Sequence, residues 1–271
     1  MLLSIDVGNT QTTLGLFDGE DIVEHWRIST DPRRTADELA VLMQGLMGAH
    51  PVAGTPRAAG TPAGDDRVSG LAICSSVPAV LHELREVTRR YYGDVPAVIV
   101  EPGVKTGVHV LMDNPKEVGA DRIVNALAAN HLYGGPCIVV DFGTATTFDA
   151  VNARGDYVGG AIAPGIEISV EALGMRGAQL RKIELARPRN VIGKNTVEGM
   201  QSGILYGFAG QVDGLVNRMS RELSKDPDDV QVIATGGLAP LVLGEAETID
   251  VHEPWLTLIG LRLVFERNRA A

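Results

Sequence analysis

One pattern occurs twice in this chain, and it restricts the fold more than any other feature. Residues 2–8 (LLSIDVG) read as an apolar strand that ends in Asp-x-Gly, followed by a tight turn and two further strands. The run CIVVDFGTATTF, which starts at Cys137, repeats this order about half of the 271-residue chain later. The two copies predict two duplicated lobes, each built from a three-stranded hairpin unit and helices.

The rest of the chain continues as an α/β alternation. Apolar residues at helical spacing predict helices, and short apolar runs predict strands. The expected helices cover 35–48, a segment from Pro78, a segment from 119, 196–224 and 256–268, and further strands are expected at 68–76, 96–100 and 230–237. We therefore expect an α/β fold of two duplicated lobes, residues 1–118 and 119–271, facing a central cleft. Residues 50–67, rich in Pro, Gly and Ala, read as a surface loop insertion.

Composition excludes several classes of function. A net charge of -10 disfavours a nucleic-acid binder, because affinity for a phosphate backbone depends on clustered Lys and Arg. No apolar run approaches the roughly 18–20 residues that span a bilayer, and the start of the chain lacks the basic region of a secretory signal. We expect a cytoplasmic protein without membrane insertion. Cys74 and Cys137 are expected to be buried free thiols, and the six scattered histidines predict no zinc cluster.

The turn from Asp6 to Thr13 has the residues of a phosphate cradle. Gly8 lets the backbone approach a ligand, and the turn's N–H groups and Thr hydroxyls can donate to phosphate oxygens. An ordinary hairpin turn would use the same residue types, so the turn alone leaves both interpretations open. The second turn, from Asp141 to Thr147, favours a paired site for a polyphosphate and its cation. GKNT at 193–196 fails the spacing that a P-loop requires. No G-x-G-x-x-G pattern follows a predicted strand, so the dinucleotide fingerprint is also absent from the sequence.

A third motif, Gly119-Ala120-Asp121-Arg122, opens a helix. Taken alone, Asp121 would complement the helix dipole and Arg122 would be solvated. Together with the two phosphate turns, Asp121 becomes a candidate base for an alcohol nucleophile, and Arg122 a candidate anchor for an anionic substrate.

These motifs together resemble the type III pantothenate kinases, members of the superfamily of acetate kinase, sugar kinases, Hsp70 and actin. DVGNT, NPKEVGADRIVNA, DFGTATTFD, GGAIAPGI, IGKNTVEGMQSG and ATGG occur in that family's order over nearly the whole chain. The resemblance implies two ribonuclease H-like, actin-like ATPase lobes. It also implies an enzyme that converts ATP and pantothenate into ADP and 4'-phosphopantothenate, the first step of coenzyme A biosynthesis.

The resemblance also implies which residues bind ATP and its cations. The ATP phosphates would lie on Asp6, Val7, Gly8, Asn9, Thr10, Gln11, Thr12 and Thr13, and on Thr144. Asp141 would hold an activating monovalent cation, K⁺ or NH₄⁺. Mg²⁺ would bridge the phosphates with Asp6 nearby, acting through water.

For the second substrate, the resemblance implies that Asp121 accepts the proton of the pantothenate hydroxyl. Gly119, Ala120, Asp121 and Arg122 would line the substrate pocket. Thr196 would reach the pantothenate bound by the partner subunit of a homodimer. The broad apolar face of the helix 196–224 also favours a dimer, because such a face would be unfavourable in water.

The sequence departs from the family pattern at Met112, where the family often has a Tyr whose hydroxyl contacts the substrate. This change predicts weaker pantothenate binding with the catalytic residues intact. Two alternatives stay open: another small-molecule kinase of the same superfamily, and a non-enzymatic nucleotide-binding regulator. Only a pantothenate kinase requires pantothenate for turnover.

Overall fold

The computed structural model describes residues 1–49, 67–176 and 183–269, so the expected loop insertion at 50–67 lies almost wholly outside the described residues. The chain forms two compact units. The first contains Met1–Gly107, Gly119–Val124 and Thr257–Ala271, and the second contains Val108–Val118 and Asn125–Leu256. The two compact units follow the contacts of the folded chain, whereas the two predicted lobes follow the repeat in the sequence. The predicted lobe boundary between residues 118 and 119 therefore stays a prediction.

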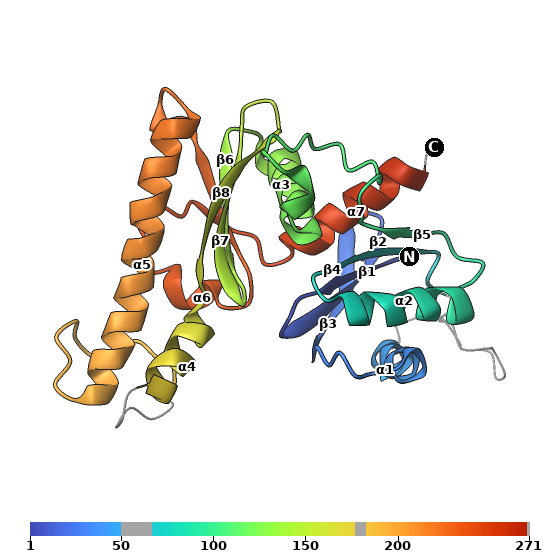
Figure 1. The fold of residues 1–271 in the computed structure, drawn as a ribbon, viewed down its shortest axis with the longest axis horizontal. Coiled ribbons are helices and arrows are strands. Elements are labelled where there is room, and N and C mark those ends of the chain that lie inside the picture. The colour runs from blue at the N-terminus through green and yellow to red at the C-terminus, as the bar shows by residue number, and fades with distance from the viewer. Residues whose placement is uncertain (50–66, 177–182, 270–271) are drawn as a thin grey trace. The chain divides into compact units, whose positions relative to one another are not determined.

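The first unit is built on a five-stranded sheet of order β3-β2-β1-β4-β5 (Figure 1). Its strands are β1 (Leu2–Val7), β2 (Gln11–Asp18), β3 (Asp21–Ser29), β4 (Gly70–Ser75) and β5 (Ala97–Ile99). The first three strands form an antiparallel meander, and β4 and β5 add parallel strands beside β1. The helices are α1 (Ala36–Ala49), α2 (Pro78–Tyr91), which begins at the expected proline, and α7 (Leu256–Arg269).

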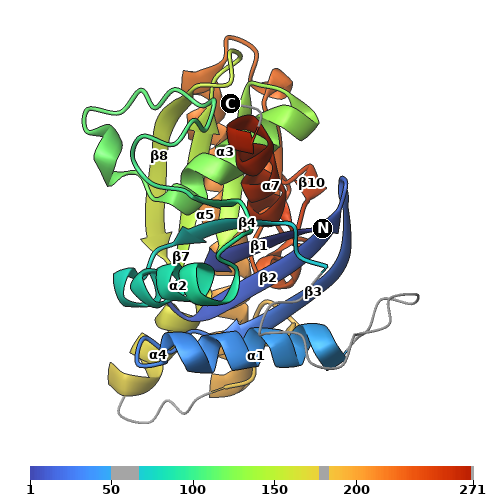
Figure 2. The same ribbon diagram turned by 90° about the vertical axis from the view of Figure 1, so that its right-hand side faces the viewer.

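Strand alternation sorts the residues of β1 between the two faces of this sheet. Leu3, Ile5 and Val7 are buried in a core with α1 and α2. Asp6 therefore lies on the other face. That face carries α7 (Figure 2). The helix approaches the sheet closely at Gly15 of β2, where an added Cβ would lie only 2.7 Å from the side chain of Leu258. The alternation thus places a carboxylate beside helices rather than within the apolar core.

The second unit repeats the first strand for strand. Its sheet has the order β10-β9-β6-β7-β8, with the same antiparallel meander and the same parallel additions. The strands are β6 (Cys137–Phe142), β7 (Ala145–Val151), β8 (Tyr157–Pro164), β9 (Gln231–Thr235) and β10 (Val251–His252). The helices are α4 (Ile166–Arg176), α5 (Thr196–Leu223), α6 (Ala239–Val242) and the part of α3 (Ala120–Tyr133) from Asn125 on, with short 3-10 helices at Pro115–Glu117 and Pro227–Asp229; the first residues of α3, up to Val124, belong to the first unit. The predicted duplicated α/β architecture is confirmed.

Helix α5 has the predicted extent, but its apolar face has a different partner from the one expected. Ile204, Phe208 and Val212 are buried in the core of the second unit, against the sheet face opposite α3 (Figure 1). Leu215 and Met219 are partly buried against the same core. The argument that this face needs a second subunit to cover it is wrong, because a helical period shows that a face is buried without showing against what. The homodimer itself stays a prediction.

Cys74 and Cys137 are buried free thiols, as predicted. Within the described ranges no helix is long and apolar enough to cross a membrane.

Candidate functional site

Asp6 lies near the end of β1, in register with Thr13 on β2 and Cys74 on β4. The Cys74 thiol donates a hydrogen bond to Asp6 Oδ1 at 3.2 Å. Burial, and then the charge of Asp121, raise the pKa of Asp6 to about 7, while the thiol acts in the opposite direction. Burial also raises the pKa of Cys74 well above its usual range, which keeps the thiol protonated as a donor. The first repeated turn therefore carries a carboxyl group whose ionisation is disfavoured by its surroundings.

The turn after Asp6 is held in place by a residue that the sequence did not single out. Thr30, just after β3, donates its hydroxyl to the Gly8 carbonyl at 2.8 Å and shares a hydrogen bond of 2.9 Å with Thr12. The Gly8 N–H donates to the Gln11 carbonyl at 3.0 Å. Thr12 is buried and Val7 is a core residue, so both have structural roles for their side chains. The exposed side chains of the predicted cradle are Asn9, Thr10 and Gln11.

Asp121 lies in the first turn of α3, and both of its oxygens have partners in the first unit. Oδ1 accepts the backbone N–H of Arg122 at 2.9 Å, and Oδ2 accepts the Ser76 hydroxyl at 3.4 Å. A Cβ on Gly119 would lie 2.4 Å from Oδ1, so only glycine leaves room for the carboxylate in this orientation. Because its charge acts on Asp6, the structure brings together two of the three predicted carboxylates. Sequence reasoning missed Ser76, which follows β4 without a motif.

Asp141 occupies the position on β6 that Asp6 occupies on β1. Its register partners are Thr147 on β7 and Thr235 on β9. Asn125 of α3 donates its side-chain amide to Asp141 Oδ2 at 3.3 Å. Gly236 follows β9 at φ +90, and a Cβ there would lie 2.5 Å from Asp141 Oδ1. Sequence reasoning missed Asn125, although it follows Asp121 by one helical turn.

The second turn and the start of α5 complete the predicted set. The Gly143 N–H donates to the Ala145 carbonyl at 3.1 Å, and the exposed Thr144 stands at the tip of the turn. Thr196 is the first residue of α5 and is exposed. The cap of α5 is Asn195, whose side chain accepts the Glu198 N–H at 3.0 Å. Capping therefore does not account for Thr196.

No group of three His, Cys, Asp or Glu side chains that could hold a metal occurs in the described part of the chain. A divalent cation at Asp6 would therefore take most of its ligands from phosphates and water, which suits Mg²⁺. At Asp141, the fully buried Asn125 Oδ1 has no hydrogen-bond partner in the described structure. An acceptor without a donor beside a carboxylate fits a cation.

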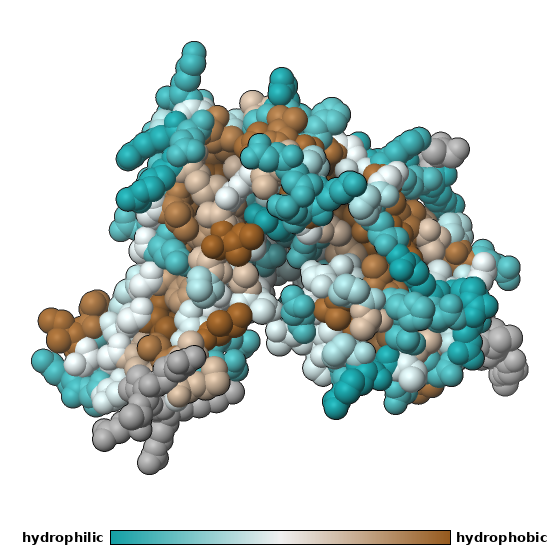
Figure 3. Space-filling model, in the orientation of Figure 1, coloured by the Kyte–Doolittle hydropathy of each residue, from teal (hydrophilic) through white to brown (hydrophobic). Residues whose placement is uncertain are grey.

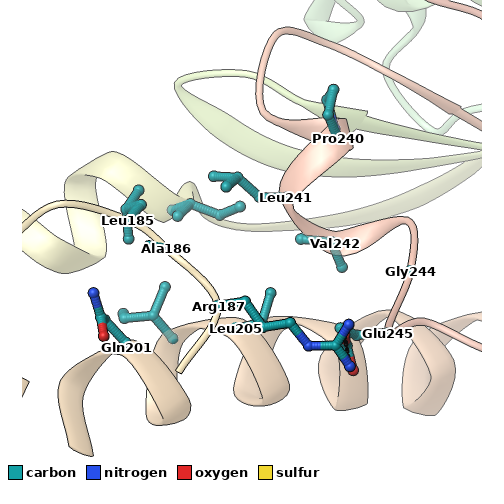
Figure 4. A pocket seen from close by; sticks show the side chains of 12 residues that line it. Leu185, Ala186, Arg187, Gln201, Leu205, Pro240, Leu241, Val242, Gly244 and Glu245 are labelled. Carbon is teal, nitrogen blue, oxygen red and sulfur yellow. Dashed lines mark ion pairs between the residues drawn. The ribbon is translucent and has the colours of Figure 1, made fainter. Parts of the chain in front are cut away.

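A mostly apolar pocket of about 250 Å³ lies elsewhere in the second unit, between α5, α6 and residues 185–187 (Figure 4). Arg187 and Glu245 form an ion pair of 2.8 Å at its edge. None of the sequence-predicted site residues lines this pocket.

The chain is similar to proteins of one family over most of its length. The model of a family described as type III pantothenate kinase matches residues 2–218. A Streptomyces avermitilis protein named type III pantothenate kinase is 80% identical over 268 residues, which cover 99% of this chain and 98% of the relative.

Two solved structures share the fold at low sequence identity. A putative Baf family transcriptional activator from Campylobacter jejuni is 13% identical with a TM-score of 0.58, covering 99% of this chain and 100% of that one. The activator of the 2-hydroxyisocaproyl-CoA dehydratase from Clostridium difficile, with bound ADPNP, is 14% identical with a TM-score of 0.54, covering 99% and 96%. Both support the duplicated actin-like ATPase fold.

Proposed function

Because the chain belongs to the type III pantothenate kinase family, we propose that it transfers the γ-phosphoryl group of ATP to the hydroxyl of pantothenate, with Asp121 as general base. The product would be 4'-phosphopantothenate, for coenzyme A biosynthesis. The observation that supports this role for Asp121 is its fixed carboxylate, held between the Arg122 N–H and the Ser76 hydroxyl beside Asp6. Phosphoryl transfer depends on positioning and electrostatics, so a base fixed beside a phosphate turn suits this reaction.

Asp121 would accept the hydroxyl proton as the alcohol oxygen attacks phosphorus. Its two hydrogen bonds fix the direction of the carboxylate and leave its remaining lone pairs for the substrate. The segment Gly119 to Arg122 would line the pantothenate pocket, with the Arg122 guanidinium as the anchor for the substrate's carboxylate. Met112 stands where a Tyr hydroxyl is common in the family, and its sulfur would lie 3.3 Å from a Cβ on Gly159. The side chain therefore packs on β8 and supplies no hydrogen-bond donor.

The ATP phosphates would lie on the two repeated turns. On the first turn, the buried Val7 and Thr12 side chains limit the contacts to backbone N–H groups and to the side chains of Asn9, Thr10, Gln11 and Thr13. On the second turn, Thr144 would contribute. Asp6 would face Mg²⁺ through its water ligands, and bound Mg²⁺ would neutralise the charge of the phosphates. Asp141 would hold the monovalent cation, K⁺ or NH₄⁺.

A homodimer would complete the site, with Thr196 of one subunit reaching pantothenate in the other. Two features of the second unit support a partner at the start of α5. Exposed apolar side chains lie on α4, just before α5 and in its first turn, at Ile168, Leu173, Met175, Val191, Ile192 and Val197. Figure 3 shows separate brown areas on this part of the surface. Gly199, Gly203 and Gly207 form an exposed stripe on α5 with open space around each. Glycines there weaken an isolated helix, so close approach of another chain would explain them.

The test of Asp121 is the Asp121→Asn variant, with Asp113→Asn as the matched control at an exposed carboxylate of the preceding segment. Loss of the base predicts a fall in kcat of about 10²- to 10⁴-fold. Calorimetric titration should show that Asp121→Asn still binds ATP and pantothenate, and the control should keep full turnover. Near-normal turnover of Asp121→Asn with normal affinity would leave Asp121 as a helix-end charge and refute its catalytic role.

A further inference from the structure

The buried carboxamide of Asn125 lies beside Asp141, and the proposed reaction does not yet use it. Asn125 is fully buried on α3, and its amide donates to Asp141 Oδ2 at 3.3 Å. Its carbonyl oxygen Oδ1 has no hydrogen-bond partner in the described structure. A buried acceptor without a donor is unfavourable and rare, so this oxygen needs an explanation.

The orientation of the carboxamide follows from the carboxylate. An ionised carboxylate only accepts hydrogen bonds, so the NH₂ end must face Asp141 and the oxygen must point elsewhere. Rotating the side chain by half a turn would set two oxygens against each other and would not satisfy either group. The unpartnered oxygen is therefore a consequence of the bond to Asp141.

The unpartnered oxygen lies near enough to Asp141 for one ion to contact both residues. The oxygen and nitrogen of a carboxamide are about 2.2 Å apart, judged from the C=O and C–N bond lengths. Asn125 Oδ1 is thus no more than about 5.5 Å from Asp141 Oδ2, given the 3.3 Å hydrogen bond and that separation. Oxygens within this separation are close enough for one potassium-sized ion, lying to the side of the amide nitrogen, to contact both.

The surroundings of Asp141 favour a cation of low charge density. Carbonyl oxygens bind K⁺ in place of its hydration shell. The register partners Thr147 and Thr235 are hydroxyl residues, and the Thr147 hydroxyl donates to Asp149 Oδ2 at 3.0 Å. A Cβ on Gly236 would lie 2.5 Å from Asp141 Oδ1, so a larger residue would crowd the carboxylate. Asp141 and Asn125 provide one carboxylate and one neutral carbonyl oxygen, and no group of three carboxylate, His or Cys side chains that could hold a divalent metal occurs in the described part of the chain.

We infer that Asn125 is a ligand of the monovalent cation, supplying Oδ1 while its amide holds Asp141. This inference rests on the proposed cation role of Asp141 and adds a second protein ligand to that site. The alternative is a purely structural role, in which Asn125 only orients Asp141 through its N–H group. The two roles differ in which end of the carboxamide matters, so variants can separate them.

The experiment titrates the full chain with Tl⁺, a potassium analogue, in the presence of Mg²⁺ and a non-hydrolysable ATP analogue. All salts are nitrates, and thallium NMR measures Tl⁺ binding. Asn125→Leu removes both ends of the carboxamide, whereas Asn125→Asp keeps an oxygen at both positions and loses the donor. Thr146→Val is the matched control, because Thr146 is equally buried, and its hydroxyl also has no partner in the described structure. Circular dichroism would verify that each variant is folded.

We expect Asn125→Leu to weaken Tl⁺ binding at least tenfold, Asn125→Asp to bind as well as wild type or better, and Thr146→Val to bind as wild type. Unchanged binding by Asn125→Leu would overturn the inference, and so would equal weakening by both Asn125 variants, which would show a purely orienting donor. In either case, Tl⁺ binding by Asp141→Ala tests the proposed cation site itself, because loss of Tl⁺ binding in this variant supports a site at Asp141. Absence of Tl⁺ binding by the wild type would overturn both.

Discussion

Replacing Asp6 by Asn should stabilise the ligand-free protein while abolishing its activity. In the folded chain, burial and the charge of Asp121 raise the pKa of Asp6 from 3.8 to about 7. Between these two pH values the folded state keeps a proton that the unfolded state has lost. The contribution of Asp6 to stability must therefore fall as pH rises from about 4 to about 7, and this deficit stays constant at higher pH. Asn carries no charge in either state and escapes this penalty.

The size of the effect follows from the shift. A change of about 3 pKa units corresponds to about 4 kcal/mol, and partial exposure of Asp6 to solvent reduces this to roughly 2 kcal/mol. For a chain of this size, about 2 kcal/mol raises the melting temperature by roughly 4–8 °C. Asp6→Asn and wild type should melt together at pH 4 and differ by this amount at pH 8.

Differential scanning calorimetry without Mg²⁺, nucleotide or pantothenate measures the difference. Asp18→Asn is the matched control, an exposed carboxylate at the end of β2, and should show no such pH dependence. Adding Mg²⁺ and ATP should stabilise the wild type more than Asp6→Asn, because the cation makes the ionised carboxylate favourable. A difference between Asp6→Asn and wild type that is equal at pH 4 and pH 8, or a destabilised variant at pH 8, would refute this account of Asp6.

Three further predictions concern the remaining site residues. Asp141→Ala should abolish the preference for K⁺ or NH₄⁺ over Na⁺ in steady-state assays at matched ionic strength, and a wild type with equal rates in all three would contradict the cation role. Gly119→Ala should lower kcat about 10²-fold with little change in melting temperature, because a new Cβ 2.4 Å from Asp121 Oδ1 displaces the base; unchanged kcat would show that the carboxylate position is not critical. Mixing Asp121→Asn with Thr196→Val should restore activity if subunits exchange, and verified heterodimers without activity, or a fully active monomer in sedimentation, would refute the shared site.

The repeated hairpins could be predicted because their signals are local. Alternating apolar residues, Asp-x-Gly turns and a proline at the start of α2 each act over a few residues, and the structure shows the same topology in both sheets. The equivalence of Asp6 and Asp141 followed from this repetition alone. Their register partners on the parallel strands, Cys74 and Thr235, depend on how distant segments align, and no local pattern marks them.

Tertiary contacts explain what the sequence did not reveal. Ser76 reaches Asp121, and Asn125 reaches Asp141, only because α3 packs near strand ends that are distant in sequence. Thr30 holds the first turn from 22 residues away. The apolar face of α5 was found from its period, but its assignment to a dimer interface was wrong because the adjacent sheet covers it.

The most direct test of the proposed function is release of ADP measured with and without pantothenate in a coupled assay. The account predicts that ADP release by the wild type requires pantothenate and that 4'-phosphopantothenate forms in equal amount, as detected by mass spectrometry. ADP release that is independent of pantothenate, or no turnover with pantothenate, Mg²⁺ and K⁺ all present, would contradict it.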